Sequence, residues 1–296
     1  MAVFFIPMIS IFPSAPRLVC LSALLLMSSC MDAGRNAATQ TATAGDDNDV
    51  ENTQTQSGYA QPAETDLPLK MTWQIQYSGE MDYSPDVDMF NLDLFDTDTK
   101  TIAELKARGI FVVCYFSAGS HENWRPDADD FPAETLGKPM EGWEGETWLD
   151  IRQIDALKPV TESRLDMAAQ KGCDGVDPDN VNGYENDTGF PLAYDDQIAF
   201  NVFLSNQARQ RGLKIGLKND LEQIPDLLPF FDWALNEQCF YYKECRLLLP
   251  FIEAGKPVFV IEYELNPEEF CFQAVNMGFN ALQKKYELDA FRFPCG

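Results

Sequence analysis

Histidine and positive charge are scarce in this chain of 296 residues. His121 is the single histidine, and 22 lysines and arginines stand against 47 aspartates and glutamates, giving a formal net charge of −25 at pH 7. A Ser/His/Asp triad would have to use His121, which we interpret as an ordinary loop residue. An acidic protein repels polyanions, so nucleic acid and anionic glycans are poor partners, and we expect no nucleic acid to bind. A cationic polymer would be attracted, although acidity could also serve solubility alone.

The motifs that bind common metals and cofactors are also missing. The sequence has no C-x-x-C pair and neither of the glycine-rich phosphate-binding motifs, G-x-G-x-x-G and G-x-x-x-x-G-K. Residues 177–182 (DPDNVN) superficially resemble a calcium loop, but Val181 stands at a ligand position and Asn182 replaces the turn glycine. We therefore expect no metal and no cofactor.

Long apolar runs are absent as well, and the longest is part of an export signal. Arg17 precedes the apolar residues 18–27, and Ser28 and Ser29 lead directly to Cys30. This run is too short to span a bilayer, and its composition predicts a signal peptide over 1–29. Small residues before a cysteine resemble the lipobox of bacterial lipoproteins, which would make Cys30 the lipidated first residue. The alternative is ordinary cleavage and a secreted protein.

The remaining chain divides into a tether and one domain. Residues 30–66 are poor in large apolar side chains and predict a flexible low-complexity tether. Residues 67–296 are long enough for one barrel domain, which we expect to be monomeric. Met31 after Cys30 favours the outer membrane or cell surface of a bacterium. The predicted protein is thus exported and contacts a membrane through its lipid anchor only.

Six cysteines lie within the predicted domain. An even number of cysteines in an exported chain predicts disulfides. We expect two local pairs and one pair between neighbouring strands: Cys239–Cys245, Cys271–Cys295 and Cys114–Cys173.

Apolar strand-like runs alternate with helix-compatible segments through the domain. The eight runs cover residues 71–77, 90–95, 110–116, 175–178, 214–218, 231–236, 258–263 and 279–283. The helix-compatible segments, each followed by glycine, are 99–108, 159–171, 194–211 and 267–277. This alternation predicts an α/β fold, a (β/α)8 TIM-like barrel with a long loop insertion after strand 3, over 117–158. A strand at 147–151 could belong to the loop or raise the barrel count to nine.

Polar side chains follow most of these runs, and in a parallel barrel they converge on one rim. We assign the acid/base pair to Asp179 and Glu237, which end the fourth and sixth strands; Asp177, Asp150 and Glu262 are the alternates. A carboxylate at either position could instead be a capped or salt-bridged rim residue, and Asp220 could cap the next helix. The predicted substrate-binding residues are Trp73, Gln76, Tyr77, Tyr115, Asp150, Asp177, Asn180, Lys218, Asn219, Asp220, Glu262 and Tyr263.

Aromatic residues accompany the same strands and the long loop. Sugar rings stack on aromatic side chains, so some of these residues could line a glycan groove, while the others pack in the core. They are Trp73, Tyr77, Tyr115, Trp124, Trp143, Trp148 and Tyr263.

Seven segments together resemble glycoside hydrolase family 114, the endo-α-1,4-polygalactosaminidases. They are WQIQY at 73–77, CYFSAGS at 114–120, WRP at 124–126, WLDIR at 148–152, GCDGVDPDN at 172–180, GLKND at 216–220 and NEQCF at 236–240. The resemblance implies a (β/α)8 barrel that cuts partly N-acetylated α-1,4-linked galactosamine polymers of microbial biofilms and fungal walls. It also implies that Asp179 is the nucleophile and Glu237 the acid/base of a retaining mechanism. Asp177 departs from the family, in which glutamate is expected at this position.

The substrate that the resemblance implies agrees with the negative net charge of the chain, because deacetylated galactosamine units are cationic near neutral pH and would be attracted to it. We expect burial and the charge of Asp179 to raise the pKa of Glu237, as a general acid requires. The competing hypotheses are a non-catalytic glycan-binding lipoprotein on the same barrel and a glycosidase for another amino-sugar polymer.

Overall fold

The computed structural model of the chain describes residues 66–296. The predicted signal peptide, Cys30 and the predicted tether up to residue 65 lie outside the described residues. Within 66–296, no helix combines the length and the apolar composition that crossing a membrane requires. The described part covers the domain predicted over 67–296.

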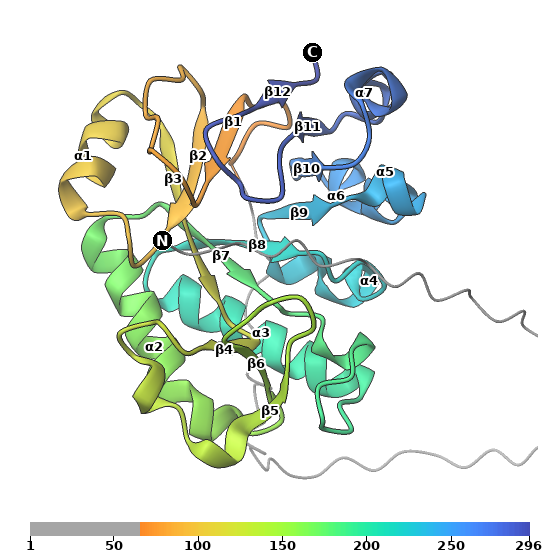
Figure 1. The fold of residues 1–296 in the computed structure, drawn as a ribbon. Coiled ribbons are helices and arrows are strands. Elements are labelled where there is room, and N and C mark those ends of the chain that lie inside the picture. The colour runs from red at the N-terminus through yellow and green to blue at the C-terminus, as the bar shows by residue number, and fades with distance from the viewer. Residues whose placement is uncertain (1–65) are drawn as a thin grey trace, which may run out of the picture. The chain divides into compact units, whose positions relative to one another are not determined.

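Eight parallel strands form the framework of this domain (Figure 1). They are β1 (Trp73–Gln76), β2 (Met89–Asp93), β3 (Phe111–Ser117), β7 (Gly175–Asp179), β8 (Lys214–Lys218), β9 (Trp233–Glu237), β10 (Val258–Glu262) and β11 (Asn280–Gln283). Each pairs in parallel with the next in this order, and the short β12 (Phe293–Pro294) adds an antiparallel strand to β11. The predicted TIM-like α/β fold is confirmed.

Hydrogen bonds join the first and the last parallel strand. The carbonyl of Asn280, the first residue of β11, accepts from Trp73 Nε1 at 3.0 Å, and its side-chain Oδ1 accepts from Met71 N at 3.1 Å. Lys284, which follows β11, donates from Nζ to Gln74 Oε1 at 3.1 Å. These contacts curl the sheet so that the carboxyl ends of its strands face one mouth.

Seven α-helices accompany the strands within the described residues. They are α1 (Thr99–Ala107), α2 (Ile154–Lys171), α3 (Tyr194–Gln210), α4 (Ile224–Leu227), α5 (Cys239–Tyr242), α6 (Leu249–Glu253) and α7 (Pro267–Met277). Helix α2 begins at Ile154, earlier than the predicted start at Pro159. The helix runs through Pro159, its sixth residue, which has no N–H to donate to the carbonyl of Asp155. Helix α7 agrees with the prediction, with Glu269 accepting from Asn266 N at its start and Gly278 at φ 81° after its end.

The segment between β3 and α2 differs from the predicted long loop. It contains a separate antiparallel sheet of β4 (Ser120–Glu122), β6 (Glu146–Leu149) and β5 (Leu136–Pro139), in that order. The ambiguous strand at 147–151 is β6 and belongs to this small sheet. The barrel strands therefore keep their predicted numbering, with β7 fourth and β9 sixth.

Two apolar layers hold the sheet in place. One lies between the strands and the outer helices, and the other fills the inside of the curled sheet around Trp73 and Trp233. A Cβ at Gly216 would lie 2.2 Å from Trp233 Nε1, so a glycine on β8 is needed to admit this indole. Trp73 packs edge-on against Phe259 with 5.0 Å between ring centroids, and its side chain is buried.

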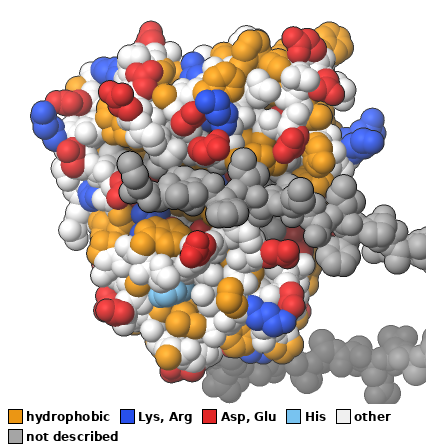
Figure 2. Space-filling view, in the orientation of Figure 1, with side chains coloured by type: hydrophobic (Ala, Val, Ile, Leu, Met, Phe, Trp, Pro, Cys, Tyr) orange, Lys and Arg blue, Asp and Glu red, His pale blue; other side chains and the backbone are white. Residues whose placement is uncertain are grey.

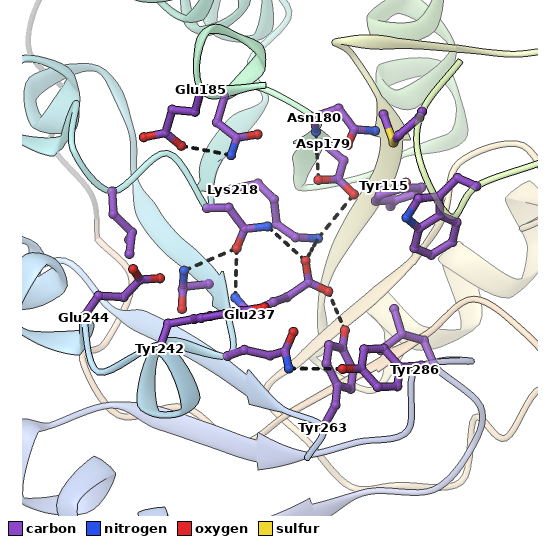
Figure 3. A pocket seen from close by; sticks show the side chains of 18 of the residues that line it. Tyr115, Asp179, Asn180, Glu185, Lys218, Glu237, Tyr242, Glu244, Tyr263 and Tyr286 are labelled. Atoms are coloured by element: carbon purple, nitrogen blue, oxygen red, sulfur yellow. Dashed lines mark hydrogen bonds and ion pairs between the residues drawn. The ribbon is translucent and has the colours of Figure 1, made fainter. Parts of the chain in front are cut away.

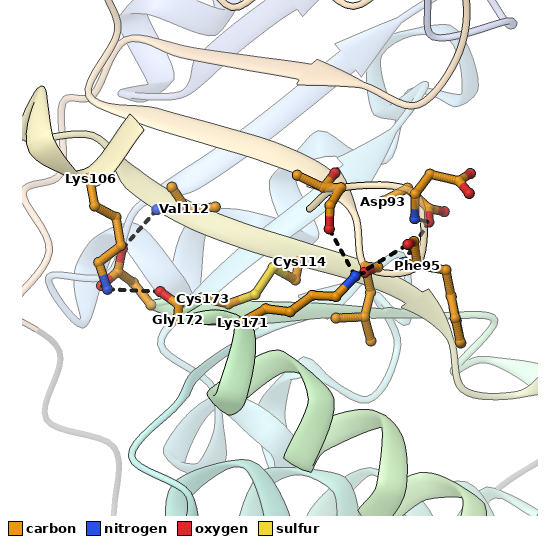
Figure 4. The surroundings of a disulfide bond; sticks show 12 residues. Asp93, Phe95, Lys106, Val112, Cys114, Lys171, Gly172 and Cys173 are labelled. Atoms are coloured by element: carbon orange, nitrogen blue, oxygen red, sulfur yellow. Dashed lines mark hydrogen bonds and ion pairs between the residues drawn. A yellow bond between two sulfur atoms is a disulfide. The ribbon is translucent and has the colours of Figure 1, made fainter. Parts of the chain in front are cut away.

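Three disulfides tie the domain together, and all three predicted pairs are confirmed. Cys114 on β3 bonds to Cys173 just before β7, where Lys106 Nζ also pairs with Asp174 Oδ1 at 2.8 Å (Figure 4). The pair spans 59 residues. In the chain-entropy account, closing a loop of that length stabilises the fold by about 4 kcal/mol. The bond therefore fixes two neighbouring strands that lead into the mouth of the barrel.

Candidate active site

Three adjacent strands deliver charged side chains to the mouth of the barrel. Asp179, Lys218 and Glu237 are the last residues of β7, β8 and β9. The residue that follows each strand has a positive φ: 61° at Asn180, 60° at Asn219 and 66° at Gln238. Left-handed backbone is uncommon for residues other than glycine, and asparagine adopts it more readily than most. The same local turn thus ends all three strands and leaves their terminal side chains facing one another.

Lys218 lies at the centre of this group (Figure 3). Its Nζ lies 3.6 Å from Asp179 Oδ2, 3.7 Å from Glu237 Oε2 and 3.8 Å from Asp177 Oδ2. The lysine side chain is only 1% exposed, whereas Asp179 and Glu237 are 20% and 23% exposed. Burial opposes the positive charge, but the attraction of the three carboxylates outweighs it and raises the pKa of Lys218. The ammonium therefore stays charged.

The shared lysine also limits the distance between Asp179 and Glu237. Their nearest oxygens can be separated by no more than the sum of their two distances to Nζ. That limit is about 7 Å, whereas carboxyl groups lie about 5–5.5 Å apart in retaining glycosidases and about 6.5–9.5 Å apart in inverting ones. The pair is thus close enough to act on one glycosidic bond, and this upper limit for single oxygen atoms is compatible with retention and with inversion.

Glu237 is held by donors on both of its oxygens. Tyr263 OH donates to Oε1, and Asn219 Nδ2 donates to Oε2 at 3.0 Å. Asn219 Oδ1 accepts from the backbone N–H of Glu237 at 2.9 Å, which fixes the asparagine in turn. Burial alone would raise the pKa of Glu237, but the attraction of Lys218 and these hydrogen bonds lower it below its usual 4.5. The prediction of a raised pKa is therefore wrong for this site without substrate.

Asp177 lies behind the pair and is fully buried. Its Oδ2 accepts from Asn91 Nδ2 at 2.8 Å and from Tyr77 OH at 3.3 Å. Burial raises its pKa even though Lys218 opposes this effect. Asp177 was predicted as an alternate catalytic group and as a substrate contact, but it does not line the pocket. In this position it holds Lys218 and Tyr77 in place.

A pocket of about 600 Å³ opens above these residues. Asp179, Glu237 and six of the predicted substrate-binding residues line it: Tyr77, Tyr115, Asn180, Lys218, Asn219 and Tyr263. The rings of Tyr77 and Tyr115 lie 4.4 Å apart, and Lys218 Nζ lies 5.7 Å from the centre of the Tyr115 ring. The structure thus brings eight of the predicted site residues together at one pocket.

The other six predicted substrate-binding residues do not line the pocket: Trp73, Gln76, Asp150, Asp177, Asp220 and Glu262. Trp73 belongs to the apolar interior of the curled sheet. Gln76 Nε2 donates to the carbonyls of Ser78 and Glu80, both at 3.0 Å, and so shapes the loop after β1. Strand ends carry inward, outward and loop-facing side chains, and sequence position alone does not tell these directions apart.

The three remaining carboxylates have structural partners. Asp150 pairs with Arg152 at 2.7 Å. Asp220 Oδ2 accepts from Asn201 Nδ2 at 2.8 Å, and burial raises the pKa of Asp220 to about 8. Glu262 Oε1 accepts from the backbone N–H of Phe240 at 2.7 Å, near the start of α5. All three are buried side chains that support loops around the mouth.

Several pocket residues were not predicted, and most come from loops and from the small sheet. They include Met140, Glu146, Asn182, Glu185, Glu222, Tyr242, Glu244, Tyr286 and Glu287, and Trp143 lines the pocket as well. Tyr286 stacks on Tyr263 with 4.4 Å between ring centroids. Local composition could have indicated some of these residues, because acidic and aromatic residues recur within a few positions after β8 and β9. Trp143 was already among the candidate groove aromatics.

The walls of the pocket are acidic. Glu185 and Glu244 line it from different loops (Figure 3). Carboxylate side chains are also spread over the described surface that Figure 2 shows. Burial raises the pKa of Glu244, and the neighbouring charges of Glu185 and Glu222 raise it further. Such mutual repulsion is relieved when a cation enters, so the pocket favours positively charged ligands.

Comparison with known proteins gives consistent matches. The sequence model of glycoside hydrolase family 114 matches residues 51–296. Ega3 of Aspergillus fumigatus, solved in complex with galactosamine, is 40% identical, with a TM-score of 0.75 over 79% of this chain and 99% of that chain. The glycoside hydrolase domain of PelA from Pseudomonas aeruginosa is 15% identical with a TM-score of 0.60, over 75% of this chain and 97% of that chain, and so shares the fold. An uncharacterized protein of Deinococcus radiodurans is 27% identical over 205 residues, which is 60% of this chain and 65% of that relative's length.

Proposed function

Because the chain belongs to glycoside hydrolase family 114, we propose that it is an endo-glycosidase acting on α-1,4-linked galactosamine and N-acetylgalactosamine polymers. The observation that carries the proposal is the pair Asp179 and Glu237, which share Lys218 and both open on an acidic pocket. The galactosamine bound by Ega3, at 40% identity, supports the choice of sugar.

In the proposed retaining mechanism the two carboxyl groups act in sequence. Asp179 attacks the anomeric carbon, while Glu237 gives its proton to the departing glycosidic oxygen. A covalent glycosyl–enzyme ester then links Asp179 to the sugar. Glu237, now a carboxylate, takes a proton from water, and the resulting hydroxide displaces Asp179 with net retention. The Lys218 ammonium lies 3.6 Å from Asp179 Oδ2, where it positions this side chain for the first attack and attracts the negative charge that returns to it when it leaves in the second step.

The lowered pKa of Glu237 has a consequence for pH dependence. A general acid must carry its proton before the first step, and that proton is lost as the pH rises through the pKa. With Glu237 as the acid, kcat/KM should therefore be highest in mildly acidic solution and fall towards neutrality. The lowered pKa also suits a nucleophile, so the reverse assignment, with Glu237 attacking, is a defined alternative.

Product analysis on partially deacetylated α-1,4-polygalactosamine tests the activity. New reducing ends are expected from the wild-type enzyme. Asp179→Asn and Glu237→Gln should each lose at least about 100-fold in rate, the typical contribution of a positioned acid or base. Asp195→Asn and Glu253→Gln are matched controls on exposed positions of α3 and α6. Binding of the polymer without new reducing ends would instead identify a non-catalytic glycan-binding protein.

Azide rescue separates the two role assignments. Azide added to a variant lacking the nucleophile attacks from the vacant face and gives a glycosyl azide of inverted configuration. Azide added to a variant lacking the acid/base opens the covalent intermediate and gives the retained configuration. We expect inversion with Asp179→Gly and retention with Glu237→Ala; the opposite result would exchange the roles. An inverted product from the wild-type enzyme would refute retention altogether.

The proposal also includes an extracytoplasmic, lipid-anchored monomer. Three disulfides in the described domain are typical of an oxidising compartment. Metabolic labelling with a radioactive fatty acid should label the wild-type chain, and Cys30→Ser should abolish the label. Sedimentation velocity of the purified domain tests the monomer, and cell fractionation tests the placement in an outer membrane.

A further inference from the structure

The hairpin between β5 and β6 reaches the pocket from the small sheet. Its turn is closed by backbone hydrogen bonds from Trp143 N to Met140 O at 3.2 Å and from Met140 N to Glu146 O at 2.9 Å. Trp143 lies in this turn and is 58% exposed, and all three of these residues line the pocket. The hairpin therefore presents one exposed indole and one carboxylate to the same space.

Glu146 is unusual among the pocket acids because it is only 7% exposed. Its Oε2 accepts from Ser120 Oγ at 2.8 Å, and Ser120 Oγ lies 2.6 Å from Ser117 Oγ. Asn180 Nδ2 donates to Ser117 Oγ at 2.9 Å, which links the group to the residue directly after Asp179. This chain of hydrogen bonds fixes Glu146 relative to Asp179, although Glu146 has no step in the proposed mechanism.

The charges that face Glu146 are mostly of its own sign. Burial and the charges of Glu122 and Asp179 raise its pKa to about 7, against the opposing effects of Ser120 and Arg125. Burial and the charges of Asp179, Glu122 and Glu146 also raise the pKa of the partly buried Tyr115. A buried carboxylate among like charges gains most from a ligand that brings a positive charge.

We propose that Glu146 and Trp143 form a subsite that selects a deacetylated galactosamine unit on the Asp179 side of the scissile bond. Glu146 pairs with the 2-ammonium group, and the Trp143 indole stacks on the sugar ring. This inference rests on the proposed function, because it names the state of the sugar that the same site accepts. An N-acetyl group at this position would carry no charge and would leave the Glu146 carboxylate unpaired.

Steady-state kinetics on two polymers, one highly and one sparsely deacetylated, tests the subsite. Glu146→Gln keeps the size and a hydrogen-bonding amide but loses the charge. Its KM for the deacetylated polymer should rise roughly tenfold or more, as expected for a hydrogen bond to a charged group. Its kcat and its KM for the acetylated polymer should change little. Glu144→Gln, an exposed neighbour that does not line the pocket, is the matched control.

The pH dependence supplies a second readout. Glu146 becomes ionised as the pH rises towards about 7, so the wild-type KM for the deacetylated polymer should fall over that range, in which the sugar ammonium is still charged. Glu146→Gln should lose this dependence. An equal rise in KM for both polymers, a loss confined to kcat, or an unchanged preference for deacetylated polymer would each overturn the proposal. If the wild-type enzyme cleaves neither polymer, the proposed function itself fails, which is a separate outcome.

Discussion

Replacing Lys218 by methionine tests the charge arrangement on which the active site depends. The substitution keeps a long side chain but removes an ammonium that lies 3.6–3.8 Å from three carboxylates. At an effective dielectric constant of about 20, each such attraction amounts to about 4 kcal/mol. The desolvation of the ammonium offsets several kcal/mol of this sum, and removing one partner of a buried ion pair typically costs about 3–5 kcal/mol.

The loss should be a large part of the free energy of unfolding, which is about 5–15 kcal/mol for a typical domain. For a domain of this size, each kcal/mol corresponds to about 2–4 °C in Tm, so Tm should fall by roughly 6–20 °C at pH 7. The deficit should shrink towards pH 4. Lys218 lowers the pKa of Glu237 and opposes the burial that raises the pKa of Asp177, so both pKa values rise when Lys218 is removed. The unpaired carboxylates of the variant can then take up protons as the pH falls from 7 towards 4, which relieves the cost of burying them.

Thermal and urea unfolding of both proteins between pH 4 and pH 7 provides the measurement. Lys284→Met is the matched control, because Lys284 is also buried but donates to Gln74 Oε1 and to the carbonyl of Asp289. Burial lowers the pKa of Lys284 to about 7, so below pH 6 this lysine is protonated in both the folded and the unfolded chain. The change in unfolding free energy caused by Lys284→Met should therefore be constant from pH 4 to pH 6. An equally large deficit of Lys218→Met at pH 4 and pH 7 would show that Lys218 acts by packing and would refute the reasoning.

Two further predictions concern the immediate surroundings of the pair. Tyr263→Phe removes a hydroxyl that donates to Glu237, so the pKa of Glu237 should rise. If Glu237 is the general acid, the alkaline limb of the kcat/KM profile then moves to higher pH. If Glu237 is the nucleophile, the acidic limb moves to higher pH instead. A pH profile identical to the wild type would contradict the role of this hydrogen bond. Gly119→Ala places a Cβ 1.8 Å from Asn180 O, so the backbone beside Asp179 must shift; we expect a lower kcat and a destabilisation of about 1–3 kcal/mol. Wild-type kcat and Tm in this variant would show that the contact is relieved without moving Asp179.

Much of the fold follows from residues that lie close together in the sequence. Alternating apolar runs and glycine-terminated helical segments predicted the parallel strands, because side-chain periodicity and left-handed helix ends are local properties. Cysteine spacing indicated the bonds Cys239–Cys245 and Cys271–Cys295, and Cys114–Cys173 followed from the expected pairing of two strands. Asp179 and Glu237 stood out for the same reason, since each ends an apolar strand in the sequence.

The electrostatics of the site were decided only by the tertiary structure. Lys218 was one substrate-contact candidate among twelve, and nothing in its neighbours along the chain indicated that three carboxylates surround it. That arrangement reversed the expected direction of the Glu237 pKa shift, because attraction and desolvation depend on distance and burial in space. The tertiary structure also decided the places of Trp73, which was a predicted substrate contact, and of Glu146, which was not predicted. The curl of the sheet buried the tryptophan inside the barrel, and the small sheet carried the glutamate into the pocket.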